Sequence, residues 1–177
     1  MTLILQSEEI KKIVYLSSDL IPIIENAFKS LTKGNTVMPP ILRLDIKKYH
    51  GESDVKAAYI EGLDSFAIKV ASGFFNNPSL GLPSSNGLMI LLDSQTGVLK
   101  SVLLDKGYLT DIRTAIAGAI ASKYLSNQDI ETAGIMGAGI QAKLQLQALL
   151  LVRKPKKIIV WGRDGNKVNK FINNFKN

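Results

Sequence analysis

The residues best suited to chemistry form a glycine-rich turn, Gly137-Ala138-Gly139-Ile140-Gln141-Ala142, with the spacing G-x-G-x-x-A. A short apolar stretch (residues 133–136) precedes the turn, and apolar residues at helical spacing follow it as far as Leu151. This order of strand, turn and helix brings backbone N–H groups and the positive end of a helix dipole against a pyrophosphate. We therefore predict a dinucleotide site, in which Gly137 permits the tight turn and Gly139 permits close approach of the phosphates. The alternative is a strand-to-helix connection that binds no ligand.

The type of dinucleotide depends on the residues that follow the next expected strand, residues 158–161. In NAD-binding folds an acidic side chain at this strand end holds the ribose hydroxyls, whereas an arginine accommodates a 2′-phosphate. The strand is followed by Gly162-Arg163-Asp164. Arg163 favours NADP(H), because a guanidinium binds a phosphate through charge and paired hydrogen bonds. Asp164 leaves NAD open, and a solvated turn charge remains the alternative for Arg163.

Composition removes several other kinds of chemistry. The 177 residues are 46% hydrophobic and 21% charged, which is typical of a globular protein. There is no cysteine, and His50 is the single histidine, so disulfides, thiol nucleophiles and cysteine or multi-histidine metal sites are excluded. The apolar stretches fall short of the roughly 20 residues that a membrane span needs, and the N-terminus lacks the pattern of a signal peptide. We expect a soluble cytoplasmic protein without a metal or a membrane partner.

The net charge of +7 is concentrated at one end of the chain. Residues 151–177 contain eight Lys or Arg residues and a single acid, whereas residues 1–150 contain 14 of each sign. A basic stripe can attract nucleic acid. No aromatic-rich sheet or recognition-helix pattern accompanies it, so we expect no nucleic-acid partner. A surplus of this kind is also expected when the acidic part of a domain lies elsewhere.

The elements that would position the glycine turn divide the chain into two predicted domains. Residues 1–128 combine helices near the start, several β-rich runs and an Ala-rich helix from Thr110, as its N-cap, to about Leu125, which predicts an α+β domain. Residues 129–177 begin a Rossmann domain with strand, turn, helix and strand, so the overall fold class is α/β. Two strands and two helices cannot bury their own faces. We therefore expect the Rossmann domain to be incomplete and the sequence to be truncated.

Several short segments, taken together, resemble a known family. They are Lys69-Val70, Asn76-Asn77, Gly81-Leu82-Pro83, Asp93-Ser94-Gln95-Thr96-Gly97, Leu109-Thr110-Asp111-Ile112-Arg113-Thr114-Ala115 and the glycine turn. In this order, from about Val37 to Phe171, they resemble the ornithine cyclodeaminase/mu-crystallin family. The resemblance implies a homodimer whose α+β domain supplies the dimer interface and much of the substrate pocket, and whose Rossmann domain holds NAD(P).

The resemblance also implies an activity on small α-amino or α-imino acids. Cyclodeaminases oxidise ornithine to an imine by hydride transfer, close the ring, release ammonia and return the hydride to give proline. Relatives are dehydrogenases and imine reductases that use the same hydride chemistry. An alternative is a mu-crystallin-like protein that binds NADPH and a carboxylate ligand without important turnover. A third interpretation is a remnant without function.

The family's site residues match individual positions of this chain. Arg43 resembles the arginine that binds the substrate carboxylate, Lys69 the catalytic lysine beside that carboxylate, and Arg113 a third cation in the first turn of its helix. A carboxylate favours a bidentate guanidinium, and a second cation fixes its plane; a buried lysine can also titrate near neutral pH. For each of the three, the alternative is a surface charge.

On the cofactor side we expect contacts from Gly137, Ala138, Gly139, Ile140, Gln141 and Arg163. Thr110 would cap its helix or touch the cofactor. The carboxylate that activates amine and water in cyclodeaminases lies in a later part of the Rossmann domain. We therefore expect the 177-residue chain alone to be catalytically inert.

Overall fold

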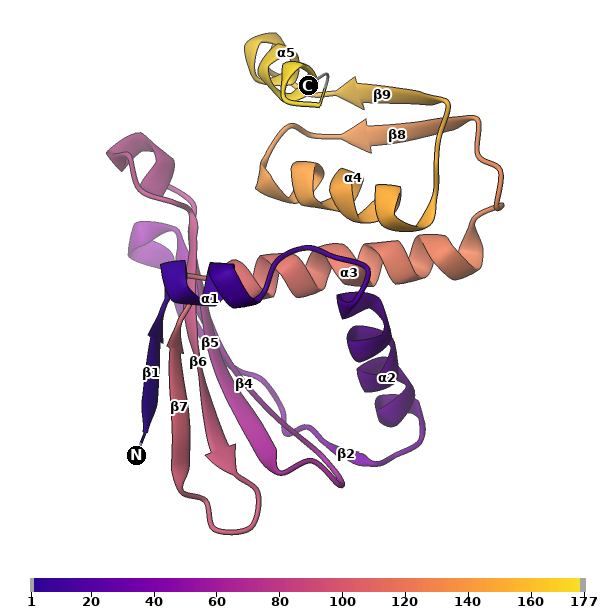
Figure 1. Ribbon diagram of the computed structural model, residues 1–177. Coiled ribbons are helices and arrows are strands. Elements are labelled where there is room, and N and C mark those ends of the chain that lie inside the picture. The colour runs from indigo at the N-terminus through magenta and orange to yellow at the C-terminus, as the bar shows by residue number, and fades with distance from the viewer. Residues whose placement is uncertain (1, 176–177) are drawn as a thin grey trace. The chain divides into compact units, whose positions relative to one another are not determined.

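The computed structural model describes residues 2–175. The chain forms two compact units, each drawn in Figure 1. The first unit comprises Met1–Tyr15 and Asn26–Thr110, and the second comprises Leu16–Glu25 and Asp111–Asn177. The chain passes between the units after Tyr15, inside α2 (Leu20–Thr32) and inside α3 (Tyr108–Leu125). The assignment of residues 1–128 to substrate and dimerisation, and of 129–177 to the nucleotide, stays a prediction.

The first unit is built on a seven-stranded mixed sheet with the order β1-β7-β6-β5-β4-β2, and β3 also pairs with β4. Its strands are β1 (Leu3–Gln6), β2 (Thr36–Val37), β3 (Leu42–Ile46), β4 (Gly51–Ile60), β5 (Ser65–Phe74), β6 (Ser85–Asp93) and β7 (Leu99–Leu104). All neighbouring strands are antiparallel except β1 and β7, which are parallel. The predicted β-rich runs are confirmed, whereas β1 was not predicted, because four residues are too few to show a pattern.

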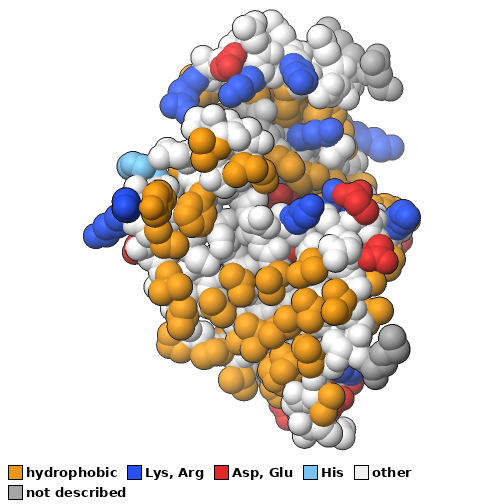
Figure 2. Space-filling view, turned by 90° about the vertical axis from the view of Figure 1, so that its left-hand side faces the viewer, with side chains coloured by type: hydrophobic (Ala, Val, Ile, Leu, Met, Phe, Trp, Pro, Cys, Tyr) orange, Lys and Arg blue, Asp and Glu red, His pale blue; other side chains and the backbone are white. Residues whose placement is uncertain are grey.

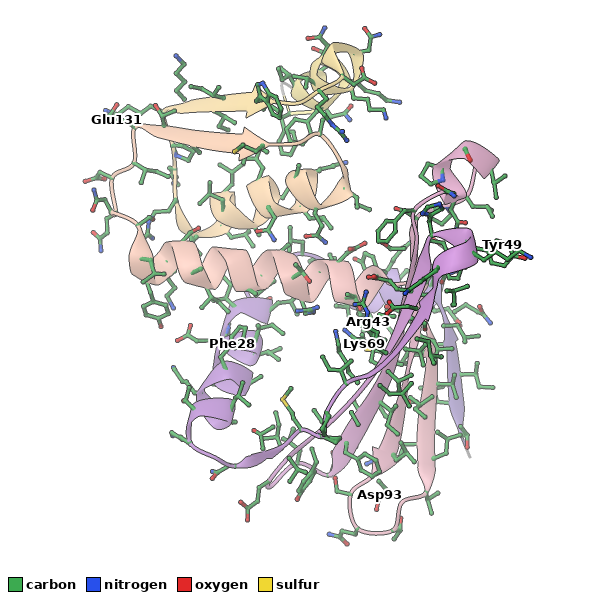
Figure 3. All side chains as sticks on the ribbon, turned by 180° about the vertical axis from the view of Figure 1, so that it is seen from behind. Phe28, Arg43, Tyr49, Lys69, Asp93 and Glu131 are labelled. Atoms are coloured by element: carbon green, nitrogen blue, oxygen red, sulfur yellow. The ribbon has the colours of Figure 1, made fainter. Side chains whose placement is uncertain are left out.

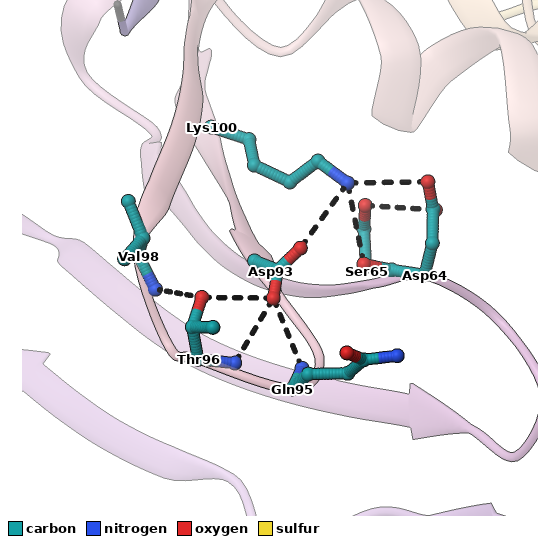
Figure 4. Close-up of polar contacts among 7 residues, drawn as sticks. All are labelled: Asp64, Ser65, Asp93, Gln95, Thr96, Val98 and Lys100. Atoms are coloured by element: carbon teal, nitrogen blue, oxygen red, sulfur yellow. Dashed lines mark hydrogen bonds and ion pairs between the residues drawn. The ribbon is translucent and has the colours of Figure 1, made fainter.

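The turn between β6 and β7 shows how local chemistry fixes the register of the sheet (Figure 4). The Asp93 carboxylate accepts hydrogen bonds from the Gln95 and Thr96 amides, at 3.1 and 2.9 Å, and from the Thr96 hydroxyl at 2.8 Å. Gly97 closes the turn at a φ of 70°, which a glycine adopts without strain. Lys100 adds an ion pair with Asp64 at 3.1 Å. These contacts hold β6 and β7 together as a hairpin.

Alternation along the strands gives the sheet one charged face and one apolar face. On the charged face Arg43 lies opposite Asp54, and Lys56 lies opposite Lys69. The apolar face carries Leu42, Val55, Ile68, Val70, Leu88, Ile90 and Val102 in register. Figure 2 shows hydrophobic side chains gathered over this face of the sheet. None of these apolar side chains is fully buried.

Short helices complete the first unit. They are α1 (Ser7–Ile13) and the 3-10 turns η1 (Lys47–Tyr49) and η2 (Asn77–Leu80). The Gln6 side chain and the Glu9 side chain form a capping box at the start of α1. The Tyr108 hydroxyl donates to the Val14 carbonyl at 2.8 Å, which ties the end of α1 to the start of α3. None of the helices formed by residues 2–175 has the length and apolar character needed to cross a membrane.

The second unit contains the predicted strand–helix–strand segment. β8 (Thr132–Met136) runs parallel to β9 (Lys157–Trp161), α4 (Ile140–Val152) connects them, and α5 (Gly165–Asn173) follows. Its core lies between helices: Ile116 and Ile120 of α3 pack with Ile21 of α2, and small residues of α3 pack against Ala148 of α4. The helical spacing of these residues places them on one side of α3, and this side of the helix is buried.

Candidate functional site

The glycine turn lines a hollow of about 290 Å³ in the second unit. Gly137–Gly139 form one side, and Trp161–Asp164 with Lys167 form the other. We call this space the glycine-turn hollow. The Gly137 amide donates to the Trp161 carbonyl at 2.7 Å, which joins the two sides at the ends of β8 and β9. The hollow therefore lies outside the carboxyl ends of parallel strands, where ligands bind in open α/β sheets.

Two backbone features make the turn suitable for phosphates. Gly137 has a φ of 112°, a conformation that L side chains rarely adopt, and a Cβ at Gly137 or Gly139 would meet only open space. Gly139 is the N-cap of α4, and no side chain among residues 2–175 caps this helix. The first N–H groups of α4 have no partner within the helix itself and carry the positive end of its dipole. This helix start can therefore accept an anion.

The start of α5 differs, because a side chain already occupies it. Asp164 is the N-cap, and its Oδ1 accepts hydrogen bonds from the amides of Asn166 and Lys167 at 3.0 and 3.2 Å. This cap uses the one carboxylate in the hollow. Arg163 and Lys167 bring two exposed cations to the same space. Lys167 was not predicted, although its position four residues after Arg163, at the start of the following helix, was a usable signal.

The Gln141 side chain points away from the phosphate side of the turn. Its Nε2 donates to the Asp111 carboxylate of α3 at 2.7 Å. One turn later, Gln145 donates to the Thr114 carbonyl at 3.1 Å. Gly118 of α3 leaves room for the Gln145 side chain, since a Cβ at position 118 would lie 2.0 Å from the Gln145 side-chain oxygen. Gln141 thus joins α4 to α3, while its backbone remains in the first turn of α4.

Thr110 is not the N-cap of its helix, so that prediction is wrong. α3 begins at Tyr108, which places Thr110 in the first helical turn. Asp105, 1% exposed, satisfies the helix start instead: its carboxylate accepts from the amides of Gly107 and Leu109 at 3.2 and 2.7 Å. The physical reason is that an aspartate at this position offers two acceptor oxygens to the free amides. The contact of Thr110 with a cofactor stays a prediction.

On the charged face of the sheet, Arg43 is surrounded by carboxylates. Its guanidinium binds Asp45 at 3.0 Å and Glu52, and its Nη1 lies 3.7 Å from Asp54. The hydrogen bond to Asp45 and the charge of Glu52 raise the pKa of Arg43. Asp45 lies two residues after Arg43 on the same strand, whereas Glu52 and Asp54 reach Arg43 only through the register of β3 against β4, and none of the three was predicted.

Lys69 lies on the same face, with β4 between it and Arg43, and Figure 3 shows both side chains on one side of the sheet. Arg113 belongs to the second unit, where it is exposed in the second turn of α3 rather than the first, because the helix starts at Tyr108. The sheet thus brings together two of the three predicted carboxylate-binding cations. Within residues 2–175 no group of three or more His, Asp or Glu side chains is placed to hold a metal ion.

The fold and the glycine turn agree with the comparison to known proteins. The model of the ornithine cyclodeaminase/mu-crystallin family matches residues 1–177. The chain belongs to the ornithine cyclodeaminase/mu-crystallin family.

Comparison with individual proteins supports this family membership. The chain is 53% identical over 174 residues to an uncharacterized cyclodeaminase of Sinorhizobium fredii, covering 98% of this chain and 53% of that protein. It is similar to the Δ1-pyrroline-2-carboxylate reductase of Thermococcus litoralis in complex with NADH and L-proline, with 32% identity, a TM-score of 0.89, and 96% and 52% of the two chains covered. It is also similar to an archaeal alanine dehydrogenase dimer with bound NAD, with 30% identity, a TM-score of 0.90, and 99% and 53% covered. The chain spans about half the length of these relatives.

Proposed function

We propose that this chain is part of an enzyme that transfers hydride between a nicotinamide dinucleotide and a small α-amino or α-imino acid. The reaction is the conversion of ornithine to proline and ammonia, or a related dehydrogenase or imine-reductase reaction. The observation that carries this proposal is the uncapped start of α4 beside the glycine-turn hollow. The Thermococcus and archaeal relatives, whose structures contain NADH and NAD, support it.

The residues of the hollow fit a dinucleotide. Gly137 and Gly139 leave open space beside the backbone, and the first amides of α4 supply hydrogen-bond donors for the pyrophosphate. Ala138, Ile140 and the Gln141 backbone belong to the same turn. A bound nicotinamide would supply the hydride acceptor or donor, while the protein binds and orients the dinucleotide.

The cofactor that we propose is NADP(H), with NAD as the alternative. Arg163 and Lys167 line the hollow as cations, whereas the Asp164 carboxylate accepts two backbone hydrogen bonds at the start of α5. Both backbone bonds go to Oδ1 of Asp164, so Oδ2, which lies 3.9 Å from Lys167 Nζ, keeps NAD as the alternative. An arginine suits the 2′-phosphate, which favours NADP(H).

Trp161, the single tryptophan, lines the hollow, so its fluorescence can report binding. We expect NADPH to quench it at lower concentration than NADH. Arg163→Ala should remove that difference, and Lys154→Ala, which removes a charge outside the hollow, should preserve it. Absence of binding by either nucleotide would contradict the dinucleotide site, and equal binding would contradict the NADP(H) preference alone.

For the substrate we propose that Arg43, Lys69 and Arg113 bind its carboxylate and that Lys69 is catalytic. Each supplies charge-assisted donors of the kind that a carboxylate accepts. Replacing Arg43 or Arg113 with alanine should weaken carboxylate binding by about 1.5–3 kcal/mol. Calorimetric titration with L-ornithine, L-alanine and L-proline measures this effect, and unchanged affinities would contradict these roles.

Turnover assays distinguish the possible reactions. The resemblance assigns no residue of this chain to the carboxylate that activates amine and water, so we propose that the chain alone has no turnover. Ornithine, alanine and cyclic imines are therefore incubated with each nicotinamide and the full-length enzyme of which we propose this chain is a part. Ammonia release without net cofactor reduction would indicate a cyclodeaminase, and net cofactor change would indicate a dehydrogenase or reductase. Tight NADPH binding without either is the mu-crystallin-like outcome.

We also propose that two copies of the chain pair through the apolar face of the sheet. That face carries aligned aliphatic side chains that are only partly buried, and the similar archaeal alanine dehydrogenase is a dimer. Burial of such a face is the main favourable contribution to association. Sedimentation equilibrium should give a dimer, and Ile68→Glu should yield monomers. Leu80→Glu, at a 71% exposed position on η2, is the control that should remain dimeric.

A further inference from the structure

One carboxylate on the charged face has an oxygen without a hydrogen bond. Asp54 lies on β4, directly opposite Arg43 on β3 and Ala71 on β5. Its Oδ2 pairs with Lys56 at 3.0 Å. Its Oδ1 is buried and has no hydrogen-bond partner in the described part of the chain. A buried acceptor in this state is unfavourable unless another donor can reach it.

Arg43 offers the complementary group. Its Nε is used by Asp45 and its Nη2 by Glu52, whereas its Nη1 lies 3.7 Å from Asp54 Oδ1, too far for a hydrogen bond. The donor nitrogen and the acceptor oxygen thus form an ion pair without a hydrogen bond between them. An α-amino acid presents the opposite pair, a carboxylate and a protonated nitrogen, on one carbon atom.

We propose that Asp54 receives a hydrogen bond from the α-nitrogen of the substrate while Arg43 binds the carboxylate. This inference rests on the proposed function and deepens it: the site selects α-amino and cyclic imino acids over carboxylates that lack the nitrogen. Because Oδ1 is buried, the nitrogen reaches it when Arg43 turns toward the carboxylate. The Arg43 side chain is 49% exposed, so the turn displaces no packed core.

The neighbouring acids are less suited to this role. Asp45 and Glu52 each already accept a hydrogen bond from Arg43. They hold the guanidinium at two of its nitrogens in the structure, and these two contacts are released when Arg43 turns toward the ligand carboxylate. Asp54 is the least exposed of the three carboxylates, at 19% against 54% and 34%. A charged hydrogen bond at such a position is stronger than one made at the surface.

The test uses the chain itself and pairs of ligands that differ by the α-nitrogen. They are L-alanine with propionate, L-proline with cyclopentanecarboxylate, and L-ornithine with 5-aminopentanoate. In calorimetric titrations the wild type should bind the nitrogen-containing member of a pair at least about tenfold more tightly. This comparison needs no substitution, so it does not depend on whether a variant folds.

Variants then assign the selectivity to Asp54. Asp54→Asn should abolish the preference within each pair and leave the affinity for the nitrogen-free acids within about twofold, because only one hydrogen bond loses its charge. Lys56→Met removes the lysine of the Asp54 pair and should keep the preference. Asp64→Asn removes a carboxylate paired with Lys100 and is the matched control, which should behave as wild type.

The outcomes separate the two proposals. Equal affinities within every pair in the wild type would overturn the role of Asp54 while leaving a carboxylate site. A preference that survives Asp54→Asn would overturn it as well. If no acid of any pair binds, the proposed substrate function fails, and the role of Asp54 fails with it.

Discussion

The two units bury their apolar side chains in different ways. Among residues 2–175, every fully buried apolar residue except Ile10 belongs to the second unit, most of them on α3 and α4. The first unit has two ten-residue strands, β4 and β5, neither of which contains a buried apolar side chain. The second unit thus has a helical core of its own, whereas the first unit leaves one sheet face without cover. We therefore expect the sheet to be more stable when that face is covered, as in the dimer proposed above.

Substitutions in the helical core of the second unit and on the apolar face of the sheet should differ most in their effect on the free energy of unfolding. Ile116 is 0% exposed, so Ile116→Ala should lower the free energy of unfolding by about 2–5 kcal/mol, through lost burial and a residual cavity. Ile90 on the apolar sheet face is only partly buried, and Ile90→Ala should cost about 1 kcal/mol in dilute protein. Urea denaturation followed by circular dichroism measures both. Equal costs at low concentration would show that the sheet face is covered without a partner.

The next largest difference should lie in how much a single hydrogen bond contributes to the free energy of unfolding in each unit. Gln141→Ala removes a hydrogen bond to a carboxylate and should cost about 1.5 kcal/mol, the lower end for a charged partner because the contact is partly exposed. In the sheet, Ser72→Ala removes the 2.9 Å hydrogen bond between the uncharged hydroxyl groups of Ser72 and Ser53. This substitution should cost about 0.5–1 kcal/mol of unfolding free energy. The same denaturation measurements apply. A larger effect in the sheet would reverse the comparison.

Two glycine turns, one in each unit, should separate stability from binding. Gly137 and Gly97 both have positive φ, at 112° and 70°. Replacing either with alanine should cost about 1 kcal/mol of unfolding free energy, because alanine is strained in this conformation. Only Gly137→Ala should also weaken NADPH binding measured by Trp161 fluorescence. Loss of binding in Gly97→Ala would argue against the glycine-turn hollow as the site.

The smallest expected effect is a pH dependence of the unfolding free energy that arises from Asp93 in the first unit. Hydrogen bonds from the Thr96 hydroxyl and from the Thr96 and Gln95 amides lower the pKa of Asp93 below its ordinary value of 3.8. The stability that this provides is present above the ordinary pKa and is lost as the pH falls through the lower folded pKa. The unfolding free energy of wild type minus that of Asp93→Asn should therefore shrink in acid. A difference that stays constant across this range would contradict the assignment.

Much of the fold followed from the sequence because local patterns determine it. The glycine turn with its flanking strand and helix needed only spacing, and the β6–β7 hairpin needed only Asp93 and Gly97. The error at Thr110 is also local: Asp105, three residues before the helix, competes for the same amides and was not considered.

The charged face of the sheet could not be predicted in the same way. Arg43 and Asp54 are eleven positions apart in the chain, and only the pairing of β3 with β4 brings them together. A shift of one residue in that pairing would send one of them to the other face. The sequence showed that Arg43 was a candidate, but not which acids would surround it.

The cap at the start of α5 limits how the proposed cofactor preference could be redesigned. An acid at the end of β9 would have to replace Gly162 or Arg163, since Asp164 cannot leave its amides without weakening the helix that follows. At Gly162, a Cβ would come within 2.8 Å of the Val168 side chain. Position 163 is therefore the more accessible route by which evolution or an engineer could exchange one dinucleotide for the other.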